Sequence, residues 1–174
     1  SGDAEQLKIL YKKKSGENLL TDIPALDISK EIHLLTDELT SDPEVALKKI
    51  SFQSETSADC IVRIPSPVMG RLLENVIGNS IQASGANSII KLSALVKEES
   101  VILKVEDQGI GISQEIQHKI FEPDFSTKAN KGTGLGLFVV KQICEQYKGQ
   151  ITVESKLNIG TTFQISFPKC EVNL

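Results

Sequence analysis

Hydrophobic residues recur along the chain with a helical period in some segments and alternate with polar residues in others. The first helical segment runs from Ile28 to Leu39, where Ile32 and Leu35 share one side with Leu39. This spacing predicts an amphipathic helix. Two short apolar runs that follow it, residues 50–53 and 61–64, predict strands.

Two further helices are predicted in the middle and in the C-terminal third of the chain. Ser66 and Pro67 suit a helix start, as cap and first residue, and Gly85 ends that helix. A last helix is expected at residues 135–147, closed by Gly149. The residues that recur on the inner side of the middle helix are Met69, Leu72, Leu73, Val76, Ile77, Ser80 and Ile81.

Alternating hydrophobic residues predict two β-hairpins, one at residues 90–105 and the other at 150–167. Between them we expect a short helix at residues 113–121 and a polar loop at 122–134. Helices that pack on one face of a mostly antiparallel sheet make an α+β fold, a two-layer α/β sandwich.

Composition limits the classes of protein to which this chain can belong. With 174 residues, of which 40% are hydrophobic, one domain with a hydrophobic core is expected. No apolar run approaches the ~20 residues of a membrane helix, so we expect no membrane insertion of this segment. A net charge of −4 gives no basic surface for nucleic acid. The three cysteines are widely spaced without a CxxC pair, which argues against disulfides and a zinc site and favours a reducing cytoplasm.

The chain does not begin with Met, and Ser1-Gly2 looks like the remnant of a cleaved tag. We therefore expect a piece of a larger protein. The predicted organisation is a helix or linker remnant at residues 3–47, the main domain at 48–170 and a C-terminal tail at 171–174.

Polar residues occupy the side of the middle helix that lies opposite its apolar stripe. Asn75, Asn79 and Gln82 share this side, at spacings of four and three residues. The amide oxygen of Asn79 is a hard ligand of the kind that Mg²⁺ prefers, and this ion keeps several waters and needs few protein ligands. A solvated helix face is the alternative explanation of the same residues.

Asp107 directly follows a predicted strand and precedes Gly109 and Gly111. A carboxylate at the end of a strand can accept a hydrogen bond from the exocyclic amine of adenine. Glycines let the backbone approach the base closely. Taken alone, a simple turn explains the Asp-x-Gly pattern better.

A second glycine cluster, Gly132-Thr-Gly-Leu-Gly-Leu137, ends the polar loop and opens the last helix. Free backbone N–H groups at a helix start can bind phosphate, and Lys128 and Lys131 add positive charge nearby. A flexible glycine hinge is the alternative. The chain has no P-loop, and an acid placed before the first glycines, with GxGxG spacing in the second cluster, does not fit the dinucleotide fingerprint.

In this order the motifs resemble those of the catalytic ATP-binding domain of sensor histidine kinases. That domain belongs to the superfamily shared with gyrase, the ninety-kilodalton heat-shock chaperones and mismatch-repair ATPases. The resemblance implies a Bergerat-type two-layer sandwich, with about three helices on one face of a mixed sheet and a mobile ATP lid at residues 121–136. The matching segments, from about residue 60 to 168, are the N box Asn75–Asn79, the G1 box Asp107–Gly111, the F box Phe121–Lys128, the G2 box Gly132–Leu137 and the last glycine motif Gly160–Phe163.

The resemblance also implies a role for each candidate residue. Asn79 would hold Mg²⁺, and Asn75 would support the phosphate end of ATP. The residues expected around the adenine are Asp107, which would bind its amine, Gly109, Gly111 and, through water, Thr161 or Thr162. The residues expected near the phosphates are Lys128, Thr133, Gly134, Leu135, Gly136 and Leu137.

The ATP-hydrolysing members of the superfamily resemble one another in carrying a Glu four residues before the metal-binding Asn, where it activates water. This chain has Asn75 there, and a helix turns the neighbouring Glu74 about 100° away. Transfer of the phosphoryl group to a side chain is therefore favoured over hydrolysis. Gln82 stands where many histidine kinases have Lys, so the segment resembles the nitrogen-regulation type of kinase instead.

A histidine kinase needs a phosphorylatable His on a helical hairpin, and the chain contains only His33 and His118. His33 is followed by Leu34 rather than an acid, and His118 lies inside the nucleotide domain, so neither fits. We expect ATP and Mg²⁺ as ligands, and the acceptor hairpin of the parent protein and a response-regulator receiver domain as partners. A related serine kinase of the anti-sigma or dehydrogenase-kinase type and a pseudokinase interaction module are the alternatives.

Overall fold

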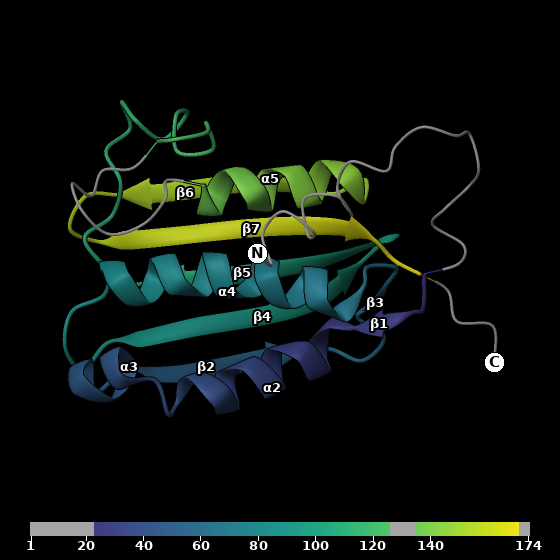
Figure 1. Cartoon of the computed structure of the whole chain (residues 1–174), viewed down its shortest axis with the longest axis horizontal. Helices are drawn as coiled ribbons and strands as arrows, with labels where there is room; N and C mark the ends of the chain where they lie inside the picture. Colours follow the sequence, from purple (N-terminus) through teal and green to yellow (C-terminus); the bar gives the residue numbers. More distant parts are fainter. Residues whose placement is uncertain (1–22, 126–134, 171–174) are drawn as a thin grey trace, which may run out of the picture.

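Five strands form the main sheet of the computed structural model, which describes residues 23–125 and 135–170. They are β2 (Ser51–Thr56), β4 (Ile89–Lys97), β5 (Ser100–Asp107), β6 (Gln150–Lys156) and β7 (Gly160–Pro168). Their order across the sheet is β2-β4-β5-β7-β6 (Figure 1). β2 runs parallel to β4, whereas the other neighbouring strands are antiparallel.

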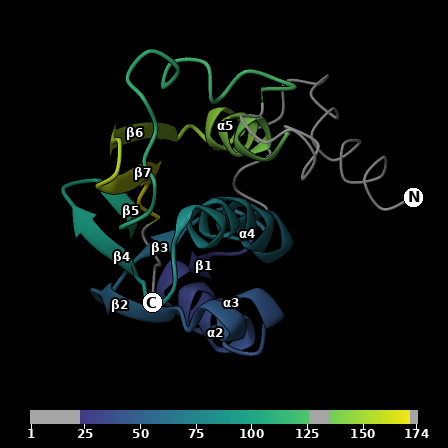
Figure 2. The same cartoon turned by 90° about the vertical axis from the view of Figure 1, so that its left-hand side faces the viewer.

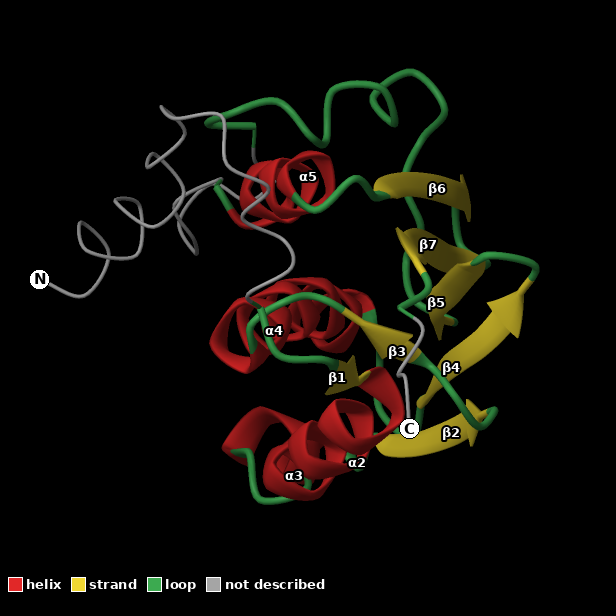
Figure 3. Ribbon diagram, turned by 90° about the vertical axis from the view of Figure 1, so that its right-hand side faces the viewer, coloured by secondary structure: helices red, strands yellow, loops and turns green. Residues whose placement is uncertain are grey.

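The described helices cover one face of this sheet, as Figures 2 and 3 show from its two ends. The helical layer consists of α2 (Ile28–Leu39), α4 (Ser66–Ala83) and α5 (Gly136–Gln146), with the short α3 (Pro43–Lys48) beside α2. A small antiparallel pair joins β1 (Leu26–Asp27) to β3 (Ile61–Val62). The predicted α+β sandwich is confirmed. None of these helices is long and apolar enough to cross a membrane.

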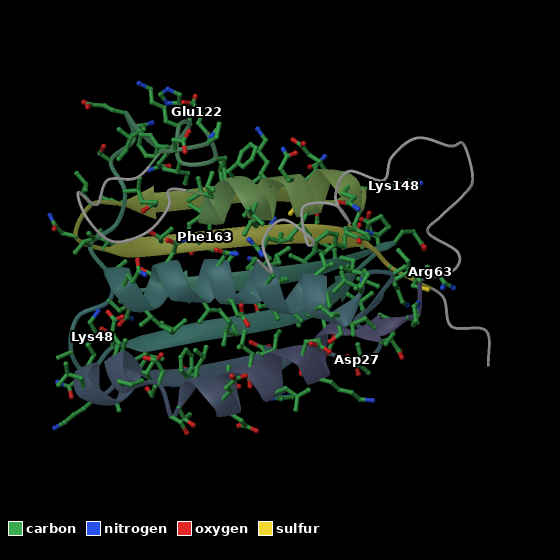
Figure 4. The ribbon with its side chains drawn as sticks, viewed as in Figure 1. Asp27, Lys48, Arg63, Glu122, Lys148 and Phe163 are labelled. Carbon is green, nitrogen blue, oxygen red and sulfur yellow. The ribbon has the colours of Figure 1, made fainter. Side chains whose placement is uncertain are left out.

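The hydrophobic core lies between the two layers. In β5, Val101, Leu103 and Val105 are buried while the residues between them are more exposed, because successive side chains of a strand point to opposite faces. Phe163 of β7 continues the same buried layer (Figure 4). Leu72 of α4 is fully buried on the opposing helix face. The alternation in the sequence therefore correctly predicted which face of the strands is buried against the helices.

Part of the segment 3–47 packs into this same core. α2 has the bounds predicted from the sequence, and Asp27 caps it by accepting a hydrogen bond from the Ser29 N–H at 3.0 Å. Ile28 and Ile32 are fully buried, and α2 packs against α4. The packed elements thus include residues 26–48, ahead of the boundary at 48 that the sequence predicts.

The helix predicted at residues 113–121 is wrong, because the segment forms successive turns. The N–H groups of Ile116, Lys119 and Glu122 each donate to a carbonyl three residues earlier, at 2.9–3.1 Å. The Gln117 side chain fastens the segment to its neighbours by donating to the carbonyls of Ile112 and Ser155, both at 2.9 Å. The segment is thus held by turn hydrogen bonds and by the Gln117 side chain rather than by the hydrogen bonds of a regular helix.

α3 has no counterpart among the predicted elements. Asp42 caps it, and Pro43 occupies its first turn. Lys48, labelled in Figure 4, donates from Nζ to the Ile81 carbonyl at 2.9 Å and pairs with Glu44 at 2.8 Å. α3 therefore supports the C-terminal end of α4.

Replacement of Ile32 by Ala tests whether α2 belongs to the core. We expect the free energy of unfolding in urea to fall by about 2–5 kcal/mol, because a fully buried side chain is removed. Leu34→Ala is the matched control on the same helix, since Leu34 is 67% exposed, and its effect should stay within about 0.5 kcal/mol. Equal effects of the two variants would show that α2 does not pack as described.

Candidate functional site

Residues of four of the predicted motifs meet toward one end of the sheet, on the left of Figure 1. The last turn of α4 contacts the loop after β5, where the Ile110 N–H donates to the Ala83 carbonyl at 3.1 Å. The start of β7 pairs with the end of β5, with Thr161 opposite Asp107. The first residue of α5, Gly136, lies against Asn75 of α4. Segments far apart in the sequence thus converge here.

Asp107, the last residue of β5, carries the most enclosed carboxyl group of the site and is 7% exposed. The Ser80 hydroxyl donates to its Oδ2 at 2.9 Å, and the Gly109 N–H donates to its Oδ1 at 2.8 Å. Burial raises the pKa of this carboxyl above its ordinary value of 3.8, while hydrogen bonds from Gly109, Ser80 and the Thr161 backbone oppose the rise. Because an ionised carboxylate has about four lone-pair sites, it can accept further hydrogen bonds from a ligand.

The loop that follows Asp107 lies in close contact with the turn between β6 and β7. Gly111 has a φ of +69°, and a Cβ there would overlap the Lys156 carbonyl. The Asn158 N–H donates to the Ile110 carbonyl at 2.8 Å. A Cβ on Gly109 would lie 2.5 Å from the Ala83 carbonyl oxygen. The fold therefore requires glycine at both positions, because the backbone of this loop lies in contact with the end of α4 at Gly109 and with the end of β6 at Gly111.

Thr161 and Thr162 face opposite sides of the sheet. Thr161 is 5% exposed and lies opposite Asp107, with its hydroxyl oxygen 2.8 Å from that of Ser155. Thr162 pairs with Glu106, on the face away from the helices. Since side chains alternate along a strand, the structure brings Thr161 and not Thr162 to the Asp107 side.

The two predicted asparagines are half-buried on α4. Asn75 Nδ2 donates to the Arg71 carbonyl at 2.8 Å. A Cβ on Gly136 would lie 2.8 Å from Asn75 Oδ1, so this amide oxygen borders the start of α5. Glu74 is exposed. The asparagine side of α4 and the N-terminus of α5 are thus side by side.

α5 begins without a side-chain cap at Leu135. Its first N–H groups therefore have no capping side chain among the described residues, which suits an anion. Leu135 is 38% exposed, whereas Leu137 packs against the core. The predicted residues Lys128, Thr133 and Gly134, and with them most of the predicted lid, lie outside the described residues.

Ser80 was not predicted as part of the site. It lies fully buried beside Asn79, within the stripe of α4 that faces the sheet. The sequence did hold a signal, because this is the one polar residue in an otherwise apolar stripe. Within residues 23–125 and 135–170, no group of three or more His, Cys, Asp or Glu side chains could hold a metal ion.

The described residues form two surface grooves. One, of about 480 Å³, is lined by Lys91, Glu106 and Thr162 on the open face and also touches Asp107. The other, of about 320 Å³, lies at the opposite end of the sheet, where Figure 4 labels Arg63 and Lys148. Only the first borders the candidate site.

Comparisons with known proteins give a consistent result. Residues 66–171 match the family described as histidine kinase-, DNA gyrase B-, and HSP90-like ATPase. A probable C4-dicarboxylate sensor kinase of Halalkalibacterium halodurans is 37% identical over 102 residues, which cover 59% of this chain and 19% of that protein. The histidine protein kinase SaeS of Staphylococcus aureus is 29% identical over 131 residues, covering 71% of this chain and 36% of that protein. The chain thus spans well under half the length of these relatives.

Among solved structures, the catalytic domain of histidine kinase ThkA, in a nucleotide-free form, superposes with a TM-score of 0.75. The two chains are 29% identical, and the match covers 85% of this chain and 96% of that domain. The likeness therefore extends over nearly the whole of that domain, and it includes residues of this chain that lie ahead of residue 66.

Alanine at Gly111 tests the close approach of the loop to the β6–β7 turn. We expect Gly111→Ala to lower the free energy of unfolding by more than about 1 kcal/mol, because its positive φ and the nearby Lys156 carbonyl both oppose a Cβ. Gly70→Ala is the control within α4, where nothing lies within 4 Å of a Cβ. It should raise stability by about 0.5–1 kcal/mol in the same chemical denaturation. Similar effects at both positions would contradict the described loop.

Replacement of Asp107 by Asn tests the environment of the carboxyl through pH. Because the folded-state pKa is raised, the stability that this group contributes is fully present below its ordinary pKa and is lost as pH rises through the raised value. Asn does not titrate, and its amide can still accept from Gly109 and donate to Ser80. Between about pH 4 and 7, the unfolding free energy of Asp107→Asn minus that of the wild type should therefore increase as the pH rises. A constant or shrinking difference would contradict the raised pKa.

Proposed function

This chain belongs to the histidine kinase-, DNA gyrase B- and HSP90-like ATPase family, and from that premise we propose that it is the ATP-binding catalytic domain of a sensor histidine kinase. In this proposal it binds Mg-ATP and transfers the γ-phosphoryl group to a histidine on a separate helical hairpin of a longer protein. The named relatives are sensor and histidine protein kinases. Their similarity supports this activity over that of the serine kinases of the superfamily.

The observation that carries the proposal is the enclosed Asp107 carboxylate at the junction of α4, β5 and β7. A buried acceptor whose own donors come from the backbone and from Ser80 suits an adenine amine, which brings two further N–H donors. Gly109 and Gly111 keep the neighbouring backbone free of side chains. Thr161, which lies opposite Asp107 on β7, would share a water with the base.

The phosphate end of the ligand would lie between α4 and the N-terminus of α5. Gly136 meets Asn75 there, and the uncapped N–H groups of α5 attract anions. We assign Asn79, half-buried one turn after Asn75, as the protein ligand of Mg²⁺. When bound, this ion neutralises phosphate charge. The G2-box residues Leu135 and Leu137, together with Lys128, Thr133 and Gly134, complete the proposed phosphate side.

Phosphoryl transfer rather than hydrolysis follows from the side chains of α4. A general base must reach the attacking water within hydrogen-bonding distance, and the position four residues before Asn79 is occupied by an amide, that of Asn75. Its Nδ2 is engaged with the Arg71 carbonyl. Glu74, the nearest acid in the sequence, is exposed. The acceptor of the phosphoryl group is therefore proposed to be a side chain of a partner.

Neither histidine of the chain fits the role of acceptor. His33 lies exposed on α2, on the flank of the domain, and His118 lies in the turns after the G1 box. We propose that the acceptor hairpin belongs to the parent protein and that a response-regulator receiver domain accepts the phosphoryl group next. The domain would act on the cytoplasmic side of such a sensor.

Nucleotide binding tests the proposal first. ATP with Mg²⁺ should raise the melting temperature of the wild type, with about 2.7 kcal/mol of stabilisation at a hundred times Kd. Asp107→Asn should lose this effect while staying folded. Glu106→Gln is the matched control, since it changes the exposed neighbour on the other face of β5, and it should keep the wild-type response. A wild type without any response at millimolar ATP would point to a pseudokinase interaction module.

Transfer to a separate hairpin domain tests the reaction itself. With labelled ATP and candidate acceptor hairpins, we expect label on the hairpin and none on this chain. The product should be acid-labile, as phosphohistidine is. Acid-stable label on a serine would instead assign the chain to the serine kinases of the same superfamily.

A further inference from the structure

Ser80 is the one polar residue in the buried stripe of α4, whose other buried residues are all apolar. It is completely buried. A buried hydroxyl without a partner costs roughly 1–3 kcal/mol relative to a hydrogen-bonded one. Here the partner is Asp107 Oδ2, at 2.9 Å. The hydroxyl therefore has a single well-defined contact, and that contact is with the carboxyl group of the candidate site.

The two oxygens of Asp107 are held separately. Oδ2 accepts from Ser80 on α4, and Oδ1 accepts from the Gly109 N–H in the following loop. The Thr161 backbone adds a further hydrogen bond to the carboxyl. Because both oxygens have donors, the carboxylate plane cannot turn without breaking a hydrogen bond. Each oxygen also keeps lone pairs that the protein does not use. A ligand in front of Asp107 therefore meets an acceptor of fixed position and orientation.

We propose that Ser80 is a positioning residue that gives the site its nucleobase specificity, by holding Asp107 as an acceptor aimed at the C6 substituent of a purine. This inference rests on the proposed function and extends it. A C6 amine, as in adenine, donates to the fixed carboxylate. A C6 oxygen, as in hypoxanthine, is itself an acceptor, so its lone pairs repel those of the carboxylate and the base is bound more weakly.

Loss of the Ser80 hydroxyl would relax this selection in two ways. The carboxylate would keep only its backbone hydrogen bonds, from Gly109 and Thr161. It could then turn and accept from the N1–H of an oxo-purine instead. It would also lose one of the hydrogen bonds that favour its ionised form. A protonated carboxyl can donate to a C6 oxygen. Both changes favour an oxo-purine relative to an amino-purine, whereas a general loosening of the fold would weaken both nucleotides alike.

The test compares the dissociation constants of ATP and ITP by calorimetric titration of the full 174-residue chain. ITP replaces the C6 amine by oxygen and the N1 acceptor by an N1–H donor, and it lacks the 2-amino group of GTP, so the change is confined to the base edge that would face Asp107. The wild type should prefer ATP, and in Ser80→Ala the ratio of the two dissociation constants should shift toward ITP by roughly tenfold or more.

Two further variants make the result specific. Ser80→Cys keeps a side chain of similar size with a weaker donor, so its ratio should lie between those of the wild type and Ser80→Ala, and it provides the test if the alanine variant does not fold. Ser84→Ala is the matched control, because Ser84 is a buried serine at the end of the same helix whose Oγ has no hydrogen-bond partner among the described residues. It should keep both affinities.

The outcomes separate this inference from the proposed function. A wild type that binds neither nucleotide would sink the proposed function. Binding of ATP by the wild type, together with an unchanged ATP-to-ITP ratio in Ser80→Ala, would overturn the role of Ser80 alone. Equal binding of ATP and ITP by the wild type would overturn it as well.

Discussion

The contact between α4 and the end of β5 is the constraint on which the candidate site depends. A carboxyl group at the last residue of a central strand is buried beneath a helix, where its charge is costly unless it is hydrogen-bonded. Ser80 from the helix and Gly109 from the loop supply those hydrogen bonds. The helix that holds Asp107 in place also carries the half-buried Asn75 and Asn79. One rigid element therefore fixes both ends of the proposed nucleotide site relative to each other.

The elements around this junction serve to hold it. The loop after Asp107 lies against the turn between β6 and β7, and Gly111 allows the two backbones to meet there. Ser155 reinforces the same contact by accepting from the Ile112 N–H at 2.8 Å and donating to the Gly160 carbonyl at 2.9 Å. At the far side of α4, Lys48 of α3 holds the last turn of the helix. The glycines and hydroxyls of this region therefore have structural partners in addition to any ligand.

The sequence predicted the features that have a strong local signal. The periods of α2, α4 and α5 and the alternation in β4, β5 and β7 predicted the two layers. The order of the motifs predicted that the helix bearing the asparagines and the strand ending at Asp107 lie together, and Ser80 of that helix contacts Asp107. What was missed depends on contacts that the sequence does not display. α3 contains only six residues, too few for a clear period, and the side chain of Gln117 fastens the segment after the G1 box as turns. The assignment of Thr161 rather than Thr162 needed the register of β7 against β5.

The most direct test of the account is a crystal structure of the chain with Mg²⁺ and a non-hydrolysable ATP analogue. We predict that the adenine amine lies within hydrogen-bonding distance of the Asp107 carboxylate. The phosphates should lie between Asn79 and the N-terminus of α5, with the Ser80 hydrogen bond to Asp107 retained. A nucleotide bound elsewhere, such as in the groove beside Arg63 and Lys148, would contradict the central claim.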